Sequence, residues 1–423
     1  MKKSTNRPLG TNEKVYWVLD QKNTTQFAVA AEIEGNASEN EWRKALDIVQ
    51  NRHPNLSVFI AGNEYSTAHF VPVDDCRIPL RIVNAASGES WNNILEEELS
   101  NPLDINTAPL ARATLIQQPG KSIFIFLSNH CIGDGMSAAL LIRDVLTVLS
   151  GKTVDDLLPM SSLDELAGVS LMELENEKLD KFKQTKISLV PRTTVNVERL
   201  RLSSTLTKKL IERSKSEKTT VHGTLSAAII LALKSRSDAA LEKKPVRILH
   251  PLSARTTLCL GDDFGLLLSI ITLSYEPAPQ KTFWDFAREV RQGIASTQTR
   301  EWIKGDSSAT QGLFNNGLDI NTIENALHQG TANEIMLTNL GLLSYTSDFG
   351  ALQLKSLWGP MALTPHKLAQ TIGVVTLNGE LTLTLTALAP SQSLLQAVEE
   401  MIKKVCSTQQ DLQVGLLSAY NLG

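Results

Sequence analysis

The sequence lacks three features that would assign the protein to a specialised class: cysteine pairs, a long apolar run and an excess of charge of one sign. Its 423 residues include four cysteines, and no two of them are spaced for a zinc or thioredoxin-type motif. Cysteines this sparse are typical of a reducing compartment. The longest apolar run, residues 266–273, is far shorter than the roughly 20 residues of a membrane-spanning helix. We therefore expect a cytoplasmic protein without a membrane span.

Charge of neither sign dominates. There are 41 Lys and Arg against 45 Asp and Glu, so the net charge is −4. A balance of this kind provides no cationic field for nucleic acid or for an anionic membrane. The first eight residues carry charge but have no apolar core behind them, which argues against a secretory signal.

The composition is otherwise that of a globular protein. Hydrophobic residues make up 42% of the chain and charged residues 20%, which is enough apolar surface for sizeable cores. At about 150 residues per domain, the length corresponds to two or three domains, and we expect two lobes.

Hydrophobic periodicity predicts an alternation of strands and helices in both halves. In the first half we expect strands at residues 15–19, 27–33, 56–60, 68–73, 110–117 and 122–127, and helices that begin after Ser38 and at residues 91 and 136. In the second half we expect strands at residues 246–252, 264–273, 335–337, 372–376 and 381–388, and helices at residues 206–215, 221–234, 284–297 and 394–405. Residues 152–195 have a looser, polar pattern, with one or two short helices, and connect the halves.

One segment places a candidate catalytic histidine directly after a buried strand. The strand at residues 122–127 leads into His130-Cys-Ile-Gly133-Asp134-Gly135, and a helix follows. A histidine has an unperturbed pKa of about 6.5, so it can accept a proton near neutral pH. The glycines permit a tight turn and the close approach of a substrate. Asp134 either orients the imidazole or anchors the loop to a distant cation.

This segment resembles the HxxxDG signature of the condensation and acyltransferase superfamily. The superfamily includes chloramphenicol acetyltransferase, condensation domains of nonribosomal peptide synthetases, plant BAHD enzymes and polyketide-associated acyltransferases. Further similarity lies, in the same order, at residues 101–112, at His250-Pro-Leu-Ser-Ala-Arg255 with the following Phe264-Gly265, and at residues 338–341 and 348–350.

The resemblance implies an α/β fold of two chloramphenicol-acetyltransferase-like (CAT-like) lobes in a V-shaped pseudo-dimer with a central tunnel. The first lobe would comprise residues 1–160, the crossover residues 161–195, and the second lobe residues 196–423. It further implies a monomer without a bound cofactor or metal. Coenzyme A or a phosphopantetheine thioester would serve as co-substrate, supplied as acyl-CoA or by an acyl carrier protein, and a small alcohol or amine would be the acceptor.

The resemblance also assigns roles to residues. His130 would be the general base, and Asp134 would be structural, with Arg255 as its partner. Gly133, Gly135, Thr338 and Asn339 would line the tunnel, and the Gly135 N–H would help to hold the oxyanion.

Two departures from the family pattern bear on the activity. Condensation domains usually have a second histidine where this chain has Asn129, which favours a free-standing acyltransferase that acts in natural-product or lipid biosynthesis. Ala351 replaces a tryptophan of the BAHD pattern. The alternatives are a condensation-type enzyme that forms an amide on carrier-bound substrates, and a non-catalytic docking platform.

Other signals have simpler interpretations. We expect Cys131 to pack in the core, because adjacent side chains on an extended segment point apart. Tyr16 and Trp17 are core candidates with tunnel lining as the alternative, and residues 307–317 are interpreted as a loop near the site.

Overall fold

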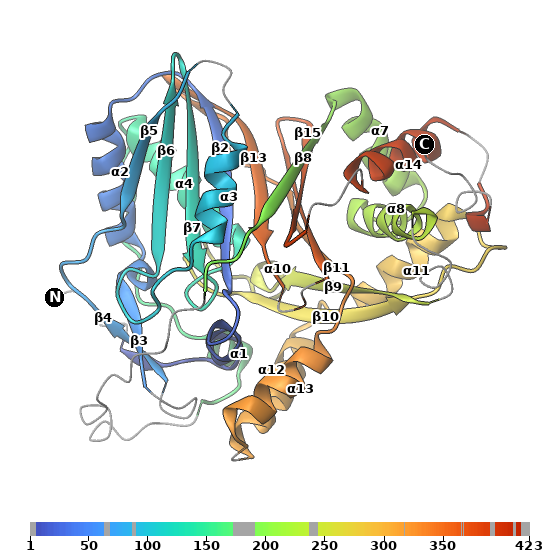
Figure 1. Cartoon of the computed structure of the whole chain (residues 1–423), viewed down its shortest axis with the longest axis horizontal. Coiled ribbons are helices and arrows are strands. Elements are labelled where there is room, and N and C mark those ends of the chain that lie inside the picture. The colour runs from blue at the N-terminus through green and yellow to red at the C-terminus, as the bar shows by residue number, and fades with distance from the viewer. Residues whose placement is uncertain are drawn as a thin grey trace.

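A computed structural model of the chain describes residues 6–62, 68–86, 90–171, 191–236, 244–316, 318–364, 366, 368–389, 394–408 and 412–415. Two six-stranded sheets lie side by side in it, and helices cover their outer faces (Figure 1). The predicted two-lobed α/β architecture is therefore confirmed.

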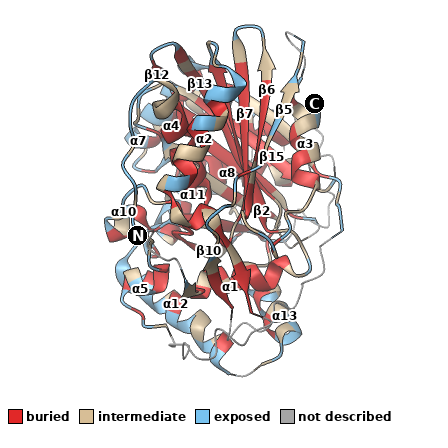
Figure 2. Cartoon of the chain, turned by 90° about the vertical axis from the view of Figure 1, so that its left-hand side faces the viewer, coloured by how far each residue is buried: buried red, intermediate tan, exposed pale blue. Residues whose placement is uncertain are grey.

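The first sheet has the strand order β12-β13-β2-β7-β6-β5. Its strands are β2 (Gln26–Glu34), β5 (Leu80–Asn84), β6 (Ala111–Gln118), β7 (Lys121–Asn129), β12 (Asp348–Phe349) and β13 (Leu352–Ala362). Successive side chains of a strand point to opposite faces. In β2, Phe27 and Val29 accordingly join the core under α2 (Glu39–Arg52) and α4 (Gly135–Leu149), whereas Ala28 and Ala30 pack with α3 (Asn92–Ser100). Both faces are buried, which explains the continuous apolar runs of β2 and β7 (Figure 2).

A small sheet accompanies the first lobe. It consists of β1 (Arg7–Pro8), β4 (His69–Pro72) and β3 (Val58–Ala61), in that order. The expected strand pair at residues 56–60 and 68–73 is confirmed as β3 and β4, which are antiparallel. The 3-10 helix η1 (Pro54–Ser57) precedes β3.

The second sheet has the order β10-β9-β11-β14-β15-β8. Its strands are β8 (Asn196–Leu202), β9 (Val246–Ser253), β10 (Leu268–Tyr275), β11 (Ile335–Leu342), β14 (Gln370–Leu377) and β15 (Glu380–Ala387). The apolar core of this lobe lies between the sheet and four helices, α7 (Ser204–Ser216), α8 (Val221–Ser235), α11 (Phe283–Ala295) and α14 (Leu394–Ser407). Further helices outside the first lobe, within the described residues, are α5 (Leu163–Ala167), α10 (Arg255–Leu258), α12 (Arg300–Asn315) and α13 (Ile320–Gly330).

The sheet order departs in one respect from the division expected at residues 160 and 196. β12 and β13 come from the second half of the chain, yet β13 pairs with β2 and so extends the first sheet. The strand moves to the neighbouring lobe because its apolar residues find partners there, including Leu354 and Leu357 in the core under α2 and α4. Of the expected crossover, residues 172–190 lie outside the described part of the chain.

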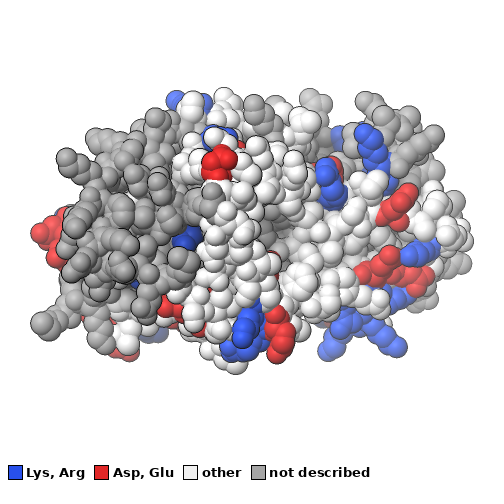
Figure 3. Space-filling model, turned by 90° about the horizontal axis from the view of Figure 1, so that it is seen from below, with Lys and Arg blue, Asp and Glu red and all other residues white. Residues whose placement is uncertain are grey.

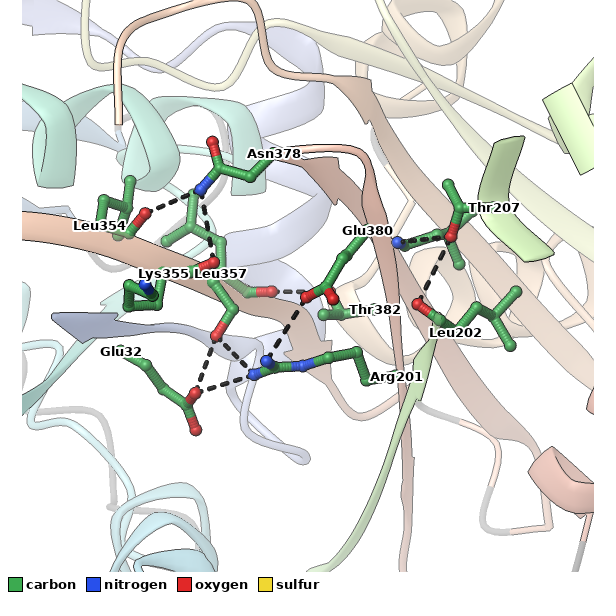
Figure 4. Close-up of polar contacts among 12 residues, drawn as sticks. Glu32, Arg201, Leu202, Thr207, Leu354, Lys355, Leu357, Asn378, Glu380 and Thr382 are labelled. Carbon is green, nitrogen blue, oxygen red and sulfur yellow. Dashed lines mark hydrogen bonds and ion pairs between the residues drawn. The ribbon is translucent and has the colours of Figure 1, made fainter. Parts of the chain in front are cut away.

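Polar contacts join the two sheets where β13 lies beside β14 and β15 (Figure 4). Arg201 of β8 donates to Glu32 Oε2 of β2 over 2.9 Å and to Ser356 Oγ of β13 over 3.0 Å. Thr382 Oγ1 of β15 donates to the Leu357 carbonyl over 2.6 Å. These contacts hold the two lobes together along β13.

The strand expected at residues 15–19 is wrong, because this segment belongs to helix α1 (Thr11–Asp20). A short apolar run has no period that distinguishes a strand from a buried helix. The side chain of Glu13 stabilises the start of the helix by accepting the Gly10 N–H over 2.6 Å.

The loop expected at residues 307–317 is also wrong over most of its length, because α12 extends to Asn315. Thr299 caps this helix by accepting the Trp302 N–H over 3.1 Å. Its buried residues Ile303, Ser307 and Phe314 lie on one face, a spacing that the many small polar residues conceal in the sequence.

In the view from below (Figure 3), described charged side chains of both signs gather on the right and along the lower edge, next to a largely uncharged middle. Among the described helices, none combines the length and the apolar character that crossing a membrane requires.

Candidate active site

His130 follows β7 directly and lines a small cavity of about 60 Å³. α1 forms one wall of this cavity, residues 23–25 and 362–364 form others, and the second lobe contributes Leu249, Ile270 and Met336. Because β7 is buried on both faces and pairs with β2 and β6, the histidine stands at the end of a rigid strand. The cavity therefore combines one imidazole with a largely apolar wall drawn from both lobes.

The imidazole of His130 is packed and oriented. Its ring stacks against Tyr16 at 4.6 Å and against Phe27 at 4.3 Å between ring centres. Nδ1 lies 3.2 Å from the Gly133 carbonyl oxygen. A carbonyl can only accept a hydrogen bond, so in the neutral ring Nδ1 carries the proton and Nε2 keeps a lone pair.

Burial lowers the pKa of His130 to about 4, although the Asp134 carboxylate and the Gly133 carbonyl act in the opposite direction. Desolvation disfavours the charged imidazolium more than these two groups favour it. At neutral pH the imidazole is therefore unprotonated and able to accept a proton.

Asp134 does not orient the imidazole by a hydrogen bond; it caps α4. Oδ1 accepts the Ser137 N–H over 2.8 Å and the Ser137 hydroxyl over 2.9 Å, and Oδ2 accepts the Leu267 N–H over 2.9 Å. The carboxylate thus joins the start of α4 to a loop of the second lobe.

Arg255 lies on the other side of this junction. Its Nη2 is 3.6 Å from Asp134 Oδ1 and donates to Ser137 Oγ over 2.8 Å. Arg255 also donates from Nη1 to the Gly261 carbonyl and from Nη2 to the Asp263 carbonyl. The structure therefore brings Asp134 and Arg255 together, with Ser137 as a third member that the sequence analysis did not single out.

The two glycines of the motif lie against bulky side chains. A Cβ at Gly133 would come within 2.3 Å of the Phe264 ring, and a Cβ at Gly135 within 2.2 Å of Pro360 Cγ. These positions require glycine for close packing between segments distant in sequence. Gly135 is also the first residue of α4, where backbone N–H groups lack partners inside the helix.

Thr338 and Asn339 lie on β11, but the cavity lining includes Met336 of that strand and neither of these two residues. The Asn339 side chain instead accepts the Gly341 N–H over 2.8 Å, beside a register shift of the strand. The cavity thus receives an apolar side chain from β11 where the sequence suggested polar ones.

Of the two aromatic residues at positions 16 and 17, one packs in the core and the other lines the cavity. Trp17 is buried in the core, whereas Tyr16 lines the cavity and stacks on His130. Adjacent side chains diverge on a strand and on a helix alike, so the sequence indicated that the two residues differ but not which of them lines the cavity. Cys131 packs in the core, and burial raises the pKa of its thiol.

Two family models match successive parts of the chain. The model of the condensation domain matches residues 17–160, and the model of the phthiocerol/phthiodiolone dimycocerosyl transferase C-terminus matches residues 191–386. The first match contains His130 and Asp134, and the second contains Arg255, so each model covers one side of the junction.

Curated relatives include two large bacterial synthases. Tyrocidine synthase 3 of Brevibacillus parabrevis is 27% identical over 129 residues, which are 30% of this chain and 2% of that protein. Surfactin synthase subunit 2 of Bacillus subtilis (strain 168) is 22% identical over 309 residues, which are 67% of this chain and 8% of the relative. The chain thus spans less than a tenth of the length of these relatives.

Solved structures with the same fold cover nearly the whole chain. Polyketide synthase associated protein 5 from Mycobacterium tuberculosis has a TM-score of 0.67 at 15% identity, and the match covers 97% of this chain and 100% of that one. The first condensation domain of the CDA synthetase has a TM-score of 0.69 at 14% identity, covering 97% and 98%. At such identities the likeness establishes the fold.

Proposed function

Because the chain belongs to the superfamily of condensation domains and HxxxD acyltransferases, we propose that it transfers an acyl group from a thioester to a hydroxyl or amine, with His130 as general base. The observation that carries the proposal is the neutral imidazole whose Nδ1 is held by the Gly133 carbonyl and which lines a cavity between the lobes. A general base must be unprotonated at working pH and fixed in one tautomer.

In the proposed reaction, the oxygen or nitrogen of the acceptor attacks the thioester carbonyl while Nε2 of His130 takes the proton from that atom. The tetrahedral intermediate then collapses, the carbon–sulfur bond breaks, and the imidazolium returns the proton to the departing thiolate. The products are an ester or amide and a free thiol. The Asp134 carboxylate favours the transient imidazolium electrostatically, and the Gly133 carbonyl continues to accept from Nδ1.

The oxyanion is assigned to the start of α4. Backbone N–H groups at a helix N-terminus carry partial positive charge and stabilise a negative charge that develops nearby. Gly135 is the first residue of α4, so its N–H is the proposed donor.

We assign the donor as a coenzyme A thioester or an acyl group on a carrier protein, and the acceptor as a small alcohol or amine in natural-product or lipid biosynthesis. The second candidate is condensation-type amide formation on carrier-bound substrates. It is favoured by the condensation-domain match and by the similarity to the tyrocidine and surfactin synthases. Asn129, in place of the second histidine of most condensation domains, favours the first candidate.

The test is thiol release from acyl-coenzyme A thioesters of increasing chain length, each offered with alcohol and amine acceptors. Removing a general base typically lowers the rate by about 10²- to 10⁴-fold, so we expect His130→Ala to lose transfer by that factor while the protein stays folded. The matched control is His328→Ala, which removes an imidazole outside the cavity lining. Full activity of folded His130→Ala would exclude the proposed mechanism.

If coenzyme A thioesters give no release, the same comparison is made with carrier-loaded thioesters. Release that depends on the carrier, on an amine acceptor and on His130 would favour the condensation-type candidate. A folded protein inactive with both donors would favour a docking platform.

A further inference from the structure

A buried carboxylate lies behind the active-site loop and takes no part in the proposed chemistry. Asp20 is the last residue of α1 and is 5% exposed. Its Oδ1 accepts the Thr25 N–H over 2.6 Å and the Thr25 hydroxyl over 2.8 Å. These donors are neutral, and burial raises the pKa of Asp20 to about 6. A carboxylate in such a place destabilises the fold unless its contacts compensate.

The first connection from Asp20 to His130 runs through the backbone of Thr25. While the amide and hydroxyl of Thr25 donate to Asp20, the Thr25 carbonyl accepts the His130 N–H over 3.2 Å. Asp20 thereby fixes Thr25, the residue whose carbonyl holds the backbone of the proposed base.

The second connection runs through Asn129, which precedes the base. The Asn129 side chain faces the Asp20 carboxylate and, as a polar partner, opposes the effect of burial by lowering the pKa of Asp20. Asn129 Oδ1 accepts the Cys131 N–H over 2.8 Å. Since the amide oxygen is engaged with Cys131 and a carboxylate can only accept, Nδ2 is the group of Asn129 that is available to donate to Asp20.

The two connections hold the backbone N–H groups of His130 and of the following Cys131. A third contact completes the arrangement, because α1, which ends at Asp20, also carries the Tyr16 ring that stacks on the imidazole. Displacing the loop by about 1 Å from its productive geometry can lower a rate by 10²-fold. A fixed loop therefore matters for transfer.

We propose that Asp20, acting through Thr25 and Asn129, is a positioning residue that sets the orientation of the His130 imidazole. This inference rests on the proposed function, in which His130 is the base. It also assigns a role to Asn129, the residue at which this chain departs from the two-histidine pattern.

The donor and acceptor pattern provides a sharp test. Asp20→Asn places an amide NH₂ opposite the NH₂ of Asn129, and Asn129→Asp places two carboxylates together. The exchange Asp20→Asn/Asn129→Asp restores one donor and one acceptor, and the new carboxylate can still accept the Cys131 N–H. We expect each single variant to lower kcat by about 10- to 100-fold, with a smaller effect on KM, and the exchange to recover most of the loss.

The independent readout is the His130 imidazole itself, observed by nitrogen NMR of histidine-labelled protein without substrate. We expect a single Nδ1–H tautomer in the parent and in the exchange variant, and a mixture of tautomers in each single variant. Signals are assigned by their loss in His130→Gln. The matched control is Asp164→Asn, because Asp164 is another buried carboxylate that holds the opposite end of α1 by accepting the Thr11 N–H over 2.8 Å. This variant should melt at a lower temperature and keep the His130 signal.

Unchanged tautomer and kcat in both folded single variants would overturn the proposal, as would an exchange variant that folds without recovering. If the exchange does not fold, Asn129→Ala decides: it should release the Cys131 N–H and mix the tautomers, and an unchanged His130 signal would overturn the proposal. The proposed function fails separately, if His130→Ala transfers acyl groups normally.

Discussion

At the scale of single residues, His130 lies between the rings of Tyr16 and Phe27, which shield both faces of the imidazole. Shielding favours the neutral ring, and the Gly133 carbonyl selects its tautomer. The motif alone predicted which residue is the candidate base. The stacking partners come from α1 and β2, more than 100 residues earlier in the chain, so only packing reveals why the ring remains neutral.

The lowered pKa of His130 makes a prediction about the pH profile. An ordinary histidine base would lose half of its activity near pH 6.5. Because burial lowers the pKa of His130 to about 4, we expect its protonation to leave kcat/KM little changed from pH 8 to pH 5.5. The measurement is kcat/KM against pH with an acceptor that does not titrate in this range. A decline centred on pH 6.5 in the parent would show that the imidazole is more hydrated than its packing indicates.

At the scale of elements, the start of α4 is the point where the two halves of the chain meet. Asp134 caps the helix and also accepts the Leu267 N–H, so one carboxylate serves a local and a long-range purpose. The sequence indicates the local part, because an aspartate before an apolar helix is a good N-cap. The long-range part depends on the loop at residues 259–267. The apolar pattern assigned residues 264–267 to the following strand, which in the structure begins only at Leu268.

This double role makes Asp134→Ala more damaging than the loss of an ordinary cap. A helix cap contributes about 0.5–2 kcal/mol, and each buried donor left without a partner costs about 1–3 kcal/mol more. We therefore expect Asp134→Ala to lower the free energy of unfolding by about 2–4 kcal/mol, with Arg255→Ala in the same direction, and both to reduce transfer. Urea denaturation measures the effect.

The control for this prediction is Asp319→Ala, which removes an exposed cap of α13. It should cost no more than about 1 kcal/mol. Equal losses in Asp134→Ala and Asp319→Ala would mean that the contact with Leu267 contributes nothing to stability.

At the scale of the whole molecule, buried histidines in both lobes couple stability to pH. In the second lobe His222 Nε2 lies 2.9 Å from His250 Nδ1, and His250 Nε2 lies 3.1 Å from the Tyr275 hydroxyl. Burial lowers the pKa of His222 to about 4 and that of His250 to about 2. The folded protein therefore keeps these rings neutral under conditions in which an unfolded chain would protonate them.

The direction of the pH effect follows from this difference. At these histidines the unfolded chain binds more protons below about pH 6.5 than the folded one, so their contribution to stability is complete above that pH and falls as the pH decreases toward 4. Each such histidine adds a slope of up to about 1.4 kcal/mol per pH unit. We expect the free energy of unfolding to decline from pH 6.5 to 5, and less steeply in His250→Gln, whatever that variant's stability at pH 8. If the free energy of unfolding declines equally steeply in the parent and in His250→Gln, His250 is protonated to the same extent in the folded and the unfolded state.

The sequence by itself determined the two-lobed α/β class, most strands and helices, and the segment that carries the candidate base. These follow from local information: the apolar period, the cap at Ser38 and the order of strand, motif and helix around His130. It did not determine that residues 15–19 are helical, because a short apolar run fits a strand and a buried helix equally.

The tertiary structure alone decided which lobe receives β13, that Met336 rather than Thr338 lines the cavity, and that Ser137 joins Asp134 and Arg255. It also decided that Asp20 binds Thr25, whose carbonyl accepts the His130 N–H. Each of these depends on contacts between segments distant along the chain, whose free energies arise only when the two sheets pack. A single sequence carries no local signal of such contacts.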